Sequence, residues 1–273
     1  MKKNMKRTAA IAGVILLLIL FILPMIFALG NGEDSQAWFR ASVGAVILIP
    51  CFAYLMMLVY RVLDRRTASR PSGEIKNVVF DIGQVLMRFD WEGYLKSYGF
   101  PEEKYEKIAD AVFRGPVWDQ RDRGCLTEPE YVNQMVSLAP EYEKDIREVM
   151  RRSGETISLM DYAVTWVKYL KERGYHLYIL SNYSEYMRQQ TIDRMEFLPY
   201  MDGTVFSCDV KLLKPEREIY ETLMEQCGID GKETVFLDDR AENCEGARAA
   251  GLHAIQFFSM KQAAKELEKL GVK

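Results

Sequence analysis

The chain is poor in the residues that disulfide frameworks, zinc sites and histidine-based catalysis require. Its 273 residues include five cysteines, scattered along the chain, and two histidines. The odd number of cysteines and the lack of any CxxC pair argue against a disulfide framework and a zinc site, and they favour a reducing compartment. The chain has only two histidines, His176 and His253, which argues against catalysis by a Ser–His or Cys–His pair.

The sequence also lacks a strong excess of charge of either sign. Charged residues make up 27% of it and the formal net charge is −3. No basic surface for a nucleic acid is therefore indicated. A chain of this length can hold one large domain or two modest ones.

Two long apolar runs stand near the N-terminus. Residues 9–30 carry no charge and follow a short basic start, and about 20 apolar residues are enough to cross a bilayer as a helix. A secretory signal peptide is the alternative, but its apolar core would be only about 7–15 residues long. The second run, residues 37–60, has Trp38 and Tyr60 at its ends, where interfacial aromatic residues belong. Its lack of charge from residue 41 onward argues against a buried core helix.

The charges around these runs predict a topology. Basic residues precede the first run and follow the second, whereas the loop between them carries Glu33 and Asp34. By the positive-inside rule, residues 1–70 then form a two-helix transmembrane hairpin with both ends in the cytoplasm. We therefore expect a multi-pass membrane protein with two spans in the lipid bilayer and a cytoplasmic C-terminal domain. Residues 71–76 contain Pro, Ser and Gly and are expected to form a linker.

From residue 77 to residue 273 the pattern is that of an α/β domain. Short apolar runs alternate with helical segments, which predicts a doubly wound (Rossmann-like) parallel sheet. The predicted strands are residues 78–81, 176–180, 203–206, 234–237 and 253–257. Four helices are predicted outside the cap. Residues 162–173 precede the second strand, and residues 214–226, 241–250 and 260–270 follow the third, fourth and fifth strands, with Pro215 in the first turn of the helix that starts at residue 214. The stretch between the first two strands is too long for a loop, so we expect an inserted α-helical cap at about residues 92–160.

Polar residues follow the ends of these strands, and the carboxyl ends of parallel strands meet at one edge of a sheet. These residues are Asp81, the Gly83 backbone, Ser181, Asn182, Lys214, Asp238 and Asp239. Taken singly, a strand-end aspartate can cap a turn, a Ser–Asn pair can cap a helix, and a lysine or an acidic pair can lie in a solvated loop. Taken together, carboxylates, a lysine and hydroxyl or amide donors suit Mg²⁺ and a phosphate dianion.

The series resembles the haloacid dehalogenase superfamily of aspartate-nucleophile phosphatases over about residues 76–273. The motifs that carry the resemblance are FDIGQVL (80–86), LSN (180–182), LLKPEREIY (212–220) and VFLDDRAENCEGARAAG (235–251). Within the superfamily they look most like the branch of sugar-phosphate phosphatases that includes α-D-glucose-1-phosphate phosphatase. The N-terminal phosphatase domain of epoxide hydrolases is a more distant relative.

The resemblance implies how a metal ion would be held. Asp81 would be the nucleophile that forms an aspartyl-phosphate, which splits one hard step into two. Asp81, the backbone carbonyl of Gly83, and Asp239 would bind Mg²⁺. Asp238 takes the place where many members have glycine, and Asn243 would support the waters of the metal ion.

The resemblance also implies how the phosphate would be bound. Ser181 and the backbone of Asn182 would bind the transferring phosphoryl oxygens, and Lys214 would neutralise charge and orient Asp81. The implied function is a membrane-anchored, Mg²⁺-dependent phosphomonoesterase acting on a small phosphorylated metabolite such as a sugar phosphate. Hydrolytic dehalogenation is a weaker alternative, because such enzymes lack the metal site to which Asp239 would belong. The sequence predicts no oligomeric state.

One position departs from the pattern of the superfamily. Most of its phosphatases have a second aspartate two residues after the nucleophile, acting as general acid and then as general base, and here that position is Gly83. General acid–base catalysis commonly contributes about 10²–10⁴-fold. Asp90 and Gln84 are candidates to supply or position a proton donor, although Asp90 can instead cap the first cap helix. The glucose-1-phosphate phosphatase branch shares the glycine. An active phosphatase and a weak or inactive phosphate-binding, regulatory module therefore both stay open.

Residues of the cap are candidates for contact with the leaving group of the substrate. Trp118, Arg121, Arg123 and Tyr131 cluster near Gly124. The alternative, which we favour, is that they are aromatic core residues and solvated arginines.

Overall fold

The computed structural model describes residues 74–273. The predicted membrane hairpin, residues 1–70, lies outside the described residues. Among residues 74–273 no helix is both long enough and apolar enough to cross a membrane.

A five-stranded parallel sheet, in the order β5-β4-β1-β6-β7, forms the centre of the described part. The strands are β1 (Asn77–Phe80), β4 (His176–Ser181), β5 (Gly203–Phe206), β6 (Thr234–Asp238) and β7 (His253–Gln256). Strand β1 lies in the middle of the sheet, because Val78 is paired with Leu177 on one side and with Val235 on the other. The predicted parallel sheet is confirmed, and each strand lies within one residue of its predicted bounds.

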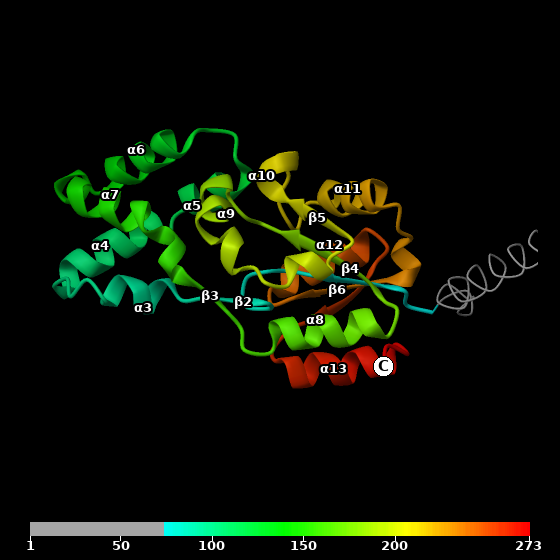
Figure 1. Ribbon diagram of the computed structural model, residues 1–273. Helices are drawn as coiled ribbons and strands as arrows, with labels where there is room; N and C mark the ends of the chain where they lie inside the picture. Colours follow the sequence, from blue (N-terminus) through cyan, green and yellow to red (C-terminus); the bar gives the residue numbers. More distant parts are fainter. Residues whose placement is uncertain (1–73) are drawn as a thin grey trace, which may run out of the picture. The chain divides into compact units, whose positions relative to one another are not determined.

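Helices cover both faces of this sheet (Figure 1). The side chains of β1 alternate between the faces, with Val78 and Phe80 on one and Val79 on the other. The helices are α8 (Ala163–Glu172) and α13 (Met260–Lys269) on the first face, and α11 (Arg217–Cys227) and α12 (Ala241–Ala249) on the second. Burial on both faces explains why the strands are continuous apolar runs without alternation.

The helix predicted to begin at Lys214 begins at Arg217 instead. The side chain of Asn182 binds both backbone groups of Lys214: its Oδ1 accepts from the Lys214 N–H at 2.8 Å and its Nδ2 donates to the carbonyl at 3.1 Å. The backbone of Lys214 is therefore hydrogen-bonded outside the helix, and Pro215 lies before the first turn. The predicted first-turn position of Pro215 was wrong for this reason.

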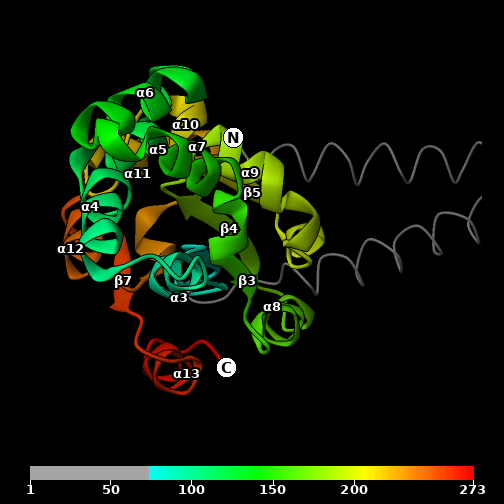
Figure 2. The ribbon, with the colours of Figure 1, turned by 90° about the vertical axis from the view of Figure 1, so that its left-hand side faces the viewer.

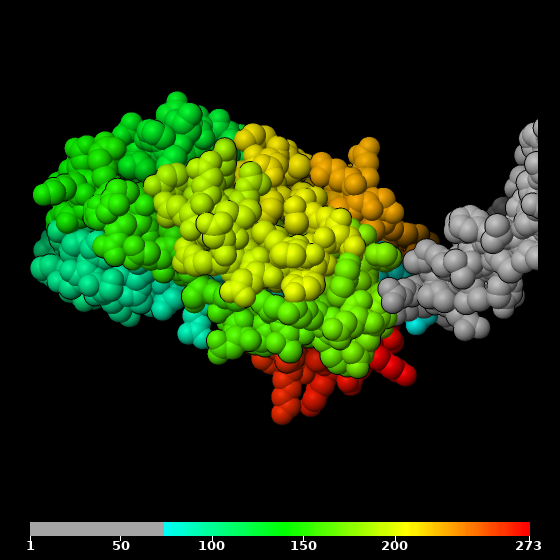
Figure 3. Space-filling model, viewed as in Figure 1, coloured from blue at the N-terminus to red at the C-terminus, as the bar shows by residue number. Residues whose placement is uncertain are grey.

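Between β1 and β4 the chain forms a helical cap with a hydrophobic cluster of its own. The cap helices are α3 (Trp91–Lys96), α4 (Glu102–Val112), α5 (Pro116–Arg123), α6 (Glu128–Leu138) and α7 (Glu143–Arg151). Figure 2, viewed from the cap side, shows these helices in front of the sheet. Figure 3 shows the surface of the cap, in teal and green, continuous with that of the yellow-green residues that follow β4.

The two chain segments that connect the sheet domain to the cap pair with each other as a short antiparallel ladder. This ladder was not predicted from the sequence. It consists of β2 (Met87–Phe89) and β3 (Ile157–Leu159). The remaining short elements are α9 (Glu185–Thr191), α10 (Ser207–Val210) and the 3₁₀ turns η1 (Pro140–Tyr142), η2 (Ser153–Thr156), η3 (Ile192–Arg194), η4 (Leu198–Tyr200) and η5 (Gly231–Glu233). The ladder holds both connections of the cap side by side, and it contributes Phe89 and Ile157 to the pocket described below.

Burial on the α11 face predicts a large effect of truncation there. Leu223 is completely buried between α11 and the sheet, whereas Leu138, at the end of α6, is 57% exposed. We expect Leu223→Ala to lower the free energy of unfolding by about 2–5 kcal/mol and Leu138→Ala to change it by less than about 0.5 kcal/mol. Urea unfolding of the purified chain, followed by circular dichroism, measures both. Equal losses in the two variants would contradict the described packing.

Candidate active site

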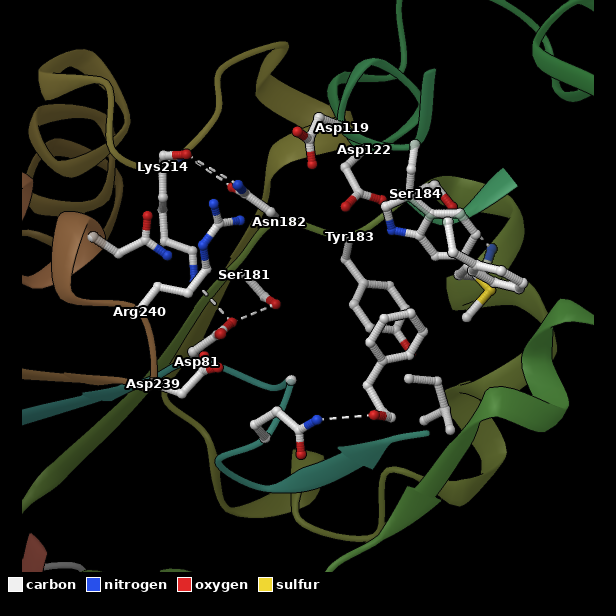
Figure 4. A pocket seen from close by; sticks show the side chains of 18 residues that line it. Asp81, Asp119, Asp122, Ser181, Asn182, Tyr183, Ser184, Lys214, Asp239 and Arg240 are labelled. Atoms are coloured by element: carbon white, nitrogen blue, oxygen red, sulfur yellow. Dashed lines mark hydrogen bonds and ion pairs between the residues drawn. The ribbon is translucent and has the colours of Figure 1, made fainter. Parts of the chain in front are cut away.

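The strand-end segments converge on one pocket of about 280 Å³ at the carboxyl edge of the sheet (Figure 4). The sequence-predicted residues that line it are Asp81, Gly83, Gln84, Ser181, Asn182, Lys214, Asp239 and Asn243. Asp238 is completely buried beneath them. The ends of β1, β4 and β6 and the loop before α11 thus contribute to a single site, as the parallel sheet predicts.

The ammonium group of Lys214 lies between two carboxylates. Its Nζ is 2.8 Å from Asp81 Oδ1 and 2.7 Å from Asp238 Oδ2, and it also donates to the carbonyl of Leu180 at 3.1 Å. Burial alone would lower the pKa of Lys214, but the charges and hydrogen bonds of Asp238 and Asp81 together raise it. Lys214 is therefore a buried cation of the site, and the alternative of a solvated surface lysine does not apply.

The two carboxylate oxygens of Asp81 have different surroundings. Oδ1 accepts from Lys214, from the Ser181 hydroxyl at 2.7 Å and from the backbone N–H of Ile82 at 2.7 Å. Oδ2 has no hydrogen bond from any residue in the part of the chain that the structure describes. Burial, with the nearby charge of Asp238, raises the pKa of Asp81 against the lowering effect of Lys214. One oxygen is thus held in place and the other is free for a ligand.

The last residue of β4, Ser181, and the next residue, Asn182, orient the site and do not cap a helix. Ser181 bonds to Asp81, and the side chain of Asn182 holds the backbone of Lys214 as described above. The N-cap of α9 is Ser184, whose hydroxyl accepts from the backbone N–H of Met187. The helix-capping alternative for Ser181 and Asn182 is therefore excluded.

Three carboxylates could share a metal ion. Asp81, Asp238 and Asp239 each offer an oxygen, and these oxygens lie within 4.8 Å of one another. Asp238 is already engaged by Lys214, by the Asn243 amide at 2.9 and 3.1 Å, and by the backbone N–H of Arg240 at 2.9 Å. Asp239 makes no ion pair with any described residue. With one lysine against three carboxylates, the site has excess negative charge, and Asp81 and Asp239 are the two carboxylates left to bind a cation.

Two further observations fit a hydrated divalent cation. Burial, together with the charges of Asp81 and Asp238, raises the pKa of Asp239 to about 6, and a cation would relieve that repulsion. The Oδ1 of Asn243 is buried without a hydrogen-bond partner, and it is an acceptor that a metal-bound water can use. An all-oxygen donor set is the one that Mg²⁺ prefers. The residues present therefore fit Mg²⁺, although Asn243 itself contacts Asp238 rather than Asp239.

Neither Asp90 nor Gln84 can supply an acidic proton in the pocket. Asp90 is exposed and caps α3, where its Oδ1 accepts from the backbone N–H of Gly93 at 2.8 Å. Gln84 does line the pocket, but its Nε2 donates to the carbonyl of Phe89 at 2.8 Å, and an amide has no acidic proton to give. The capping alternative for Asp90 is thus what the structure shows.

Among the four candidate residues of the cap, only Trp118 lines the pocket. Arg121 is buried and pairs with Glu128 at 2.8 Å, so the expectation that it is a solvated arginine was wrong. Arg123 pairs with Glu216 of the sheet domain. Arg121 and Arg123 therefore form structural ion pairs, within the cap and between the cap and the sheet domain, and they do not line the pocket.

An acidic pair on the same helix was not predicted from the sequence. Asp119 and Asp122 of α5 line the pocket, and Figure 4 shows both on the rim across from Asp81. Burial, together with the charges of Asp119 and Asp81, raises the pKa of Asp122 to about 7, although Arg121 and a hydrogen bond from the backbone N–H of Ser184 oppose the rise. The sequence held no signal for them beyond a charged helix, because which of its residues face the pocket depends on how the cap is docked.

The wall beside these acids is apolar. Its residues are Phe89, Phe113, Trp118, Ile157 and Met187. The rings of Phe89 and Trp118 stack with centroids 5.6 Å apart. Most of this wall comes from the cap and its connecting ladder, so the part of a ligand that faces away from Asp81 meets apolar surface.

The fold and the site define a capped α/β protein of the doubly wound type, with an acidic, lysine-containing pocket at the carboxyl edge of its sheet. Residues 75–251 match the haloacid dehalogenase-like hydrolases. The chain therefore belongs to the haloacid dehalogenase-like hydrolase family and is an enzyme of that class.

Relatives within this family include named phosphatases. A sesquiterpene phosphatase of Aspergillus oryzae is 23% identical over 71% of this chain and 96% of its own length. A phosphatase of Mycobacterium tuberculosis is 27% identical over 66% of this chain and 86% of its own. This chain spans only 36% of a drimenol cyclase of Aspergillus calidoustus, with 21% identity. A solved family member of Bacteroides thetaiotaomicron, in complex with magnesium and inorganic phosphate, has a TM-score of 0.55 and 25% identity, over 69% of this chain and 98% of that one.

The charge balance of the site predicts that Mg²⁺ stabilises the protein through Asp239. A ligand at about 100 times its dissociation constant adds about 2.7 kcal/mol to the free energy of unfolding. We expect MgCl₂ to raise the melting temperature of the wild type and of the exposed-site control Asp193→Asn, but not that of Asp239→Asn. Thermal unfolding with MgCl₂ and with EDTA measures the difference. A full Mg²⁺ response in Asp239→Asn would exclude Asp239 as a ligand.

Proposed function

We propose that the chain is a Mg²⁺-dependent phosphomonoesterase that works through an aspartyl-phosphate on Asp81. The observation that carries this proposal is the asymmetric environment of Asp81, with Oδ1 fixed by Lys214 and Ser181 and Oδ2 free in the pocket. The phosphatase names of the relatives support it, as does the family member solved with magnesium and phosphate. An aspartate held this way can attack phosphorus without first breaking a hydrogen bond.

The residues around the nucleophile have separate tasks. Lys214 offsets the negative charge that the phosphate brings, and the backbone N–H of Asn182 would donate to a phosphoryl oxygen. The Ser181 hydroxyl donates its one proton to Asp81 Oδ1 here, and it would turn from that carboxylate to bind a phosphoryl oxygen. Asp81, the Gly83 carbonyl and Asp239 would hold Mg²⁺. When bound, Mg²⁺ offsets the repulsion between a carboxylate and a phosphate dianion. The side chain of Asn182 is also hydrogen-bonded to the backbone of Lys214. The same segment therefore positions both the bound phosphate and the lysine that offsets its charge.

The pocket limits the substrate to a small monoester. Its volume of about 280 Å³ is near the lower end of the range for ligand pockets, roughly 300–1,000 Å³. A sugar phosphate, the class that the sequence resemblance implies, fits this size. The apolar wall around Trp118 favours a leaving group with an apolar face, such as the ring of an aryl phosphate.

A second candidate is a phosphate-binding module with little or no turnover. The observation in its favour is Gly83, which leaves the loop of the nucleophile without a general acid. Such a module would bind phosphate analogues and keep a long-lived aspartyl-phosphate on Asp81.

We further propose that residues 1–70 anchor the enzyme in a membrane through two spans, with the catalytic domain on the cytoplasmic side. Two uncharged apolar runs, the basic residues outside them and the acidic loop between them support this proposal.

Phosphate release from a panel of esters tests the proposed activity. The panel comprises sugar phosphates, nucleotides, an isoprenoid monophosphate and 4-nitrophenyl phosphate, each with Mg²⁺ and with EDTA. We expect Mg²⁺-dependent turnover by the wild type and none by Asp81→Asn, which keeps the shape of Asp81 without a nucleophilic carboxylate. A stable aspartyl-phosphate without phosphate release would favour the binding module, and no reaction with any ester would contradict the phosphatase.

Membrane attachment is measured separately. We expect the full chain to sediment with membranes and to resist extraction by alkaline carbonate, whereas a chain beginning at Ser72 should be extracted. In sealed inside-out vesicles, externally added protease should digest the catalytic domain. Release of the full chain by carbonate would contradict two membrane spans.

A further inference from the structure

A phosphomonoesterase needs a proton donor for its leaving group, and position 83 does not supply one. Attack on phosphorus leaves the departing oxygen negatively charged, which is costly when that oxygen belongs to an ordinary alcohol. We propose that Asp122 of the cap is the general acid that protonates this oxygen, and the general base that later activates water. This proposal rests on the phosphatase function proposed above.

Asp122 is on the correct side of the pocket for this task. Figure 4 shows its carboxyl group turned into the pocket across from Asp81, with Lys214 and Ser181 on the side of the nucleophile. A phosphate bound at Asp81 presents its leaving group away from the nucleophile, because attack and departure are in line. The leaving group therefore points to the part of the pocket that Trp118 and Asp122 line.

The end of α5 that carries Asp122 is fixed to the sheet domain. The carbonyl of Asp122 accepts from the Ser207 hydroxyl at 2.6 Å, and that hydroxyl in turn accepts from the backbone N–H of Tyr183 at 2.9 Å. The Asp122 carboxylate also accepts from the backbone N–H of Ser184. Tyr183 and Ser184 follow β4, and Ser207 follows β5, so the carboxyl group is anchored to the same sheet edge that holds the phosphate site.

Neighbouring contacts strengthen this attachment. Arg123 donates to the carbonyl of Lys211 at 3.1 Å, and Lys211 donates to the carbonyl of Gly124 at 2.5 Å. A Cβ at Gly124 would lie only 3.0 Å from the Cβ of Cys208, so the backbone of the cap approaches α10 closely there. These contacts hold Asp122 in one place relative to Asp81.

The electrostatic surroundings of Asp122 keep it protonated near neutral pH. Burial raises its pKa to about 7, with further raising by the charges of Asp119 and Asp81 and lowering by Arg121. The other charged groups that line the pocket are Lys214, Asp239 and Arg240. An acid with a pKa near the working pH is the best compromise between holding a proton and giving it up.

Asp122 gives up a proton in the first half-reaction and takes one back in the second. An oxygen of Asp81 attacks phosphorus, the bond from phosphorus to the leaving oxygen breaks, and that oxygen takes the electron pair and the proton of Asp122. The products are the aspartyl-phosphate, a free alcohol and an Asp122 carboxylate. A water molecule then attacks phosphorus, its proton goes to Asp122, and the bond from phosphorus to Asp81 breaks to release phosphate and the Asp81 carboxylate.

The test compares esters with good and poor leaving groups. Asp122→Asn keeps the shape and the acceptor for the Ser184 N–H but has no acidic proton. We expect its kcat/KM, which reports formation of the aspartyl-phosphate, to fall by about 10²–10⁴-fold for an alkyl phosphate and by less than about tenfold for 4-nitrophenyl phosphate, whose leaving group needs no protonation. Its kcat should fall for both esters, because hydrolysis of the shared aspartyl-phosphate also loses its base. Asp161→Asn, an exposed site away from the pocket, should keep wild-type values for both esters. A merely structural role of Asp122 would lower kcat/KM for the two esters equally.

The pH profile gives a second measurement with a defined sign. Because the pKa of Asp122 is raised, the protonated acid persists up to about pH 7 and is lost as the pH rises through that value. The wild-type kcat/KM for the alkyl phosphate should therefore fall on the alkaline side, and that of Asp122→Asn should lack this limb. A limb that persists in Asp122→Asn would overturn the assignment.

A third measurement asks whether an aspartate introduced at position 83 restores activity to Asp122→Asn. A Cβ at Gly83 would meet no atom closer than Asp81 Oδ2 at 3.9 Å, so an aspartate can be introduced there. We expect Gly83→Asp to restore at least about tenfold of the alkyl-phosphate activity of Asp122→Asn, since it supplies an acid within reach of the same oxygen. If the wild type hydrolyses esters and Asp122→Asn is equally active, only the role of Asp122 is overturned. If the wild type hydrolyses no ester, the proposed phosphatase function is overturned as well.

Discussion

The ammonium group of Lys214, buried between Asp81 and Asp238, is the interaction on which the site depends. Removing an ion from water costs several kcal/mol even after relaxation of the protein, so this arrangement persists only because each charge has partners. Lys214 has two carboxylates and a carbonyl, and Asp238 has the Asn243 amide and the Arg240 N–H as well. The ends of β1 and β6 and the loop before α11 are thereby held together. The geometry of the nucleophile follows from this triad.

The same triad leaves the pocket with unbalanced charge. One lysine neutralises one of three carboxylates, and Asp239 has no cation among the described residues. Burial raises the pKa of Asp239 to about 6, and the charges of Asp81 and Asp238 add to that rise. The pKa of Asp122, on the cap side of the pocket, is raised to about 7 mainly by burial, with smaller contributions from Asp119 and Asp81. The excess charge therefore favours a divalent cation at the sheet edge, whereas the protonation of Asp122 depends chiefly on its burial under the cap.

The sheet and its strand-end residues were predictable because buried parallel strands are continuous apolar runs whose carboxyl ends meet at one edge. The ladder of β2 and β3 was not predictable, since each strand has three residues and pairs with a partner distant in sequence. The start of α11 was misplaced because a side chain from another strand end, Asn182, holds the backbone of Lys214. Asp122 was missed for a related reason: four of the five residues 119–123 of α5 are charged, and the docking of this helix on Ser207 decides which of them faces the pocket.

These observations together explain how a phosphatase can work with glycine two residues after its nucleophile. An acid at that position would belong to the nucleophile loop and would be independent of the cap. In the arrangement proposed here the acid comes from α5, the helix that also supplies Trp118 to the leaving-group wall. Proton donation then depends on the same element that contacts the leaving group. Because that helix is hydrogen-bonded to the segments after β4 and β5, recognition of the alcohol and its protonation are coupled through one rigid attachment between cap and sheet.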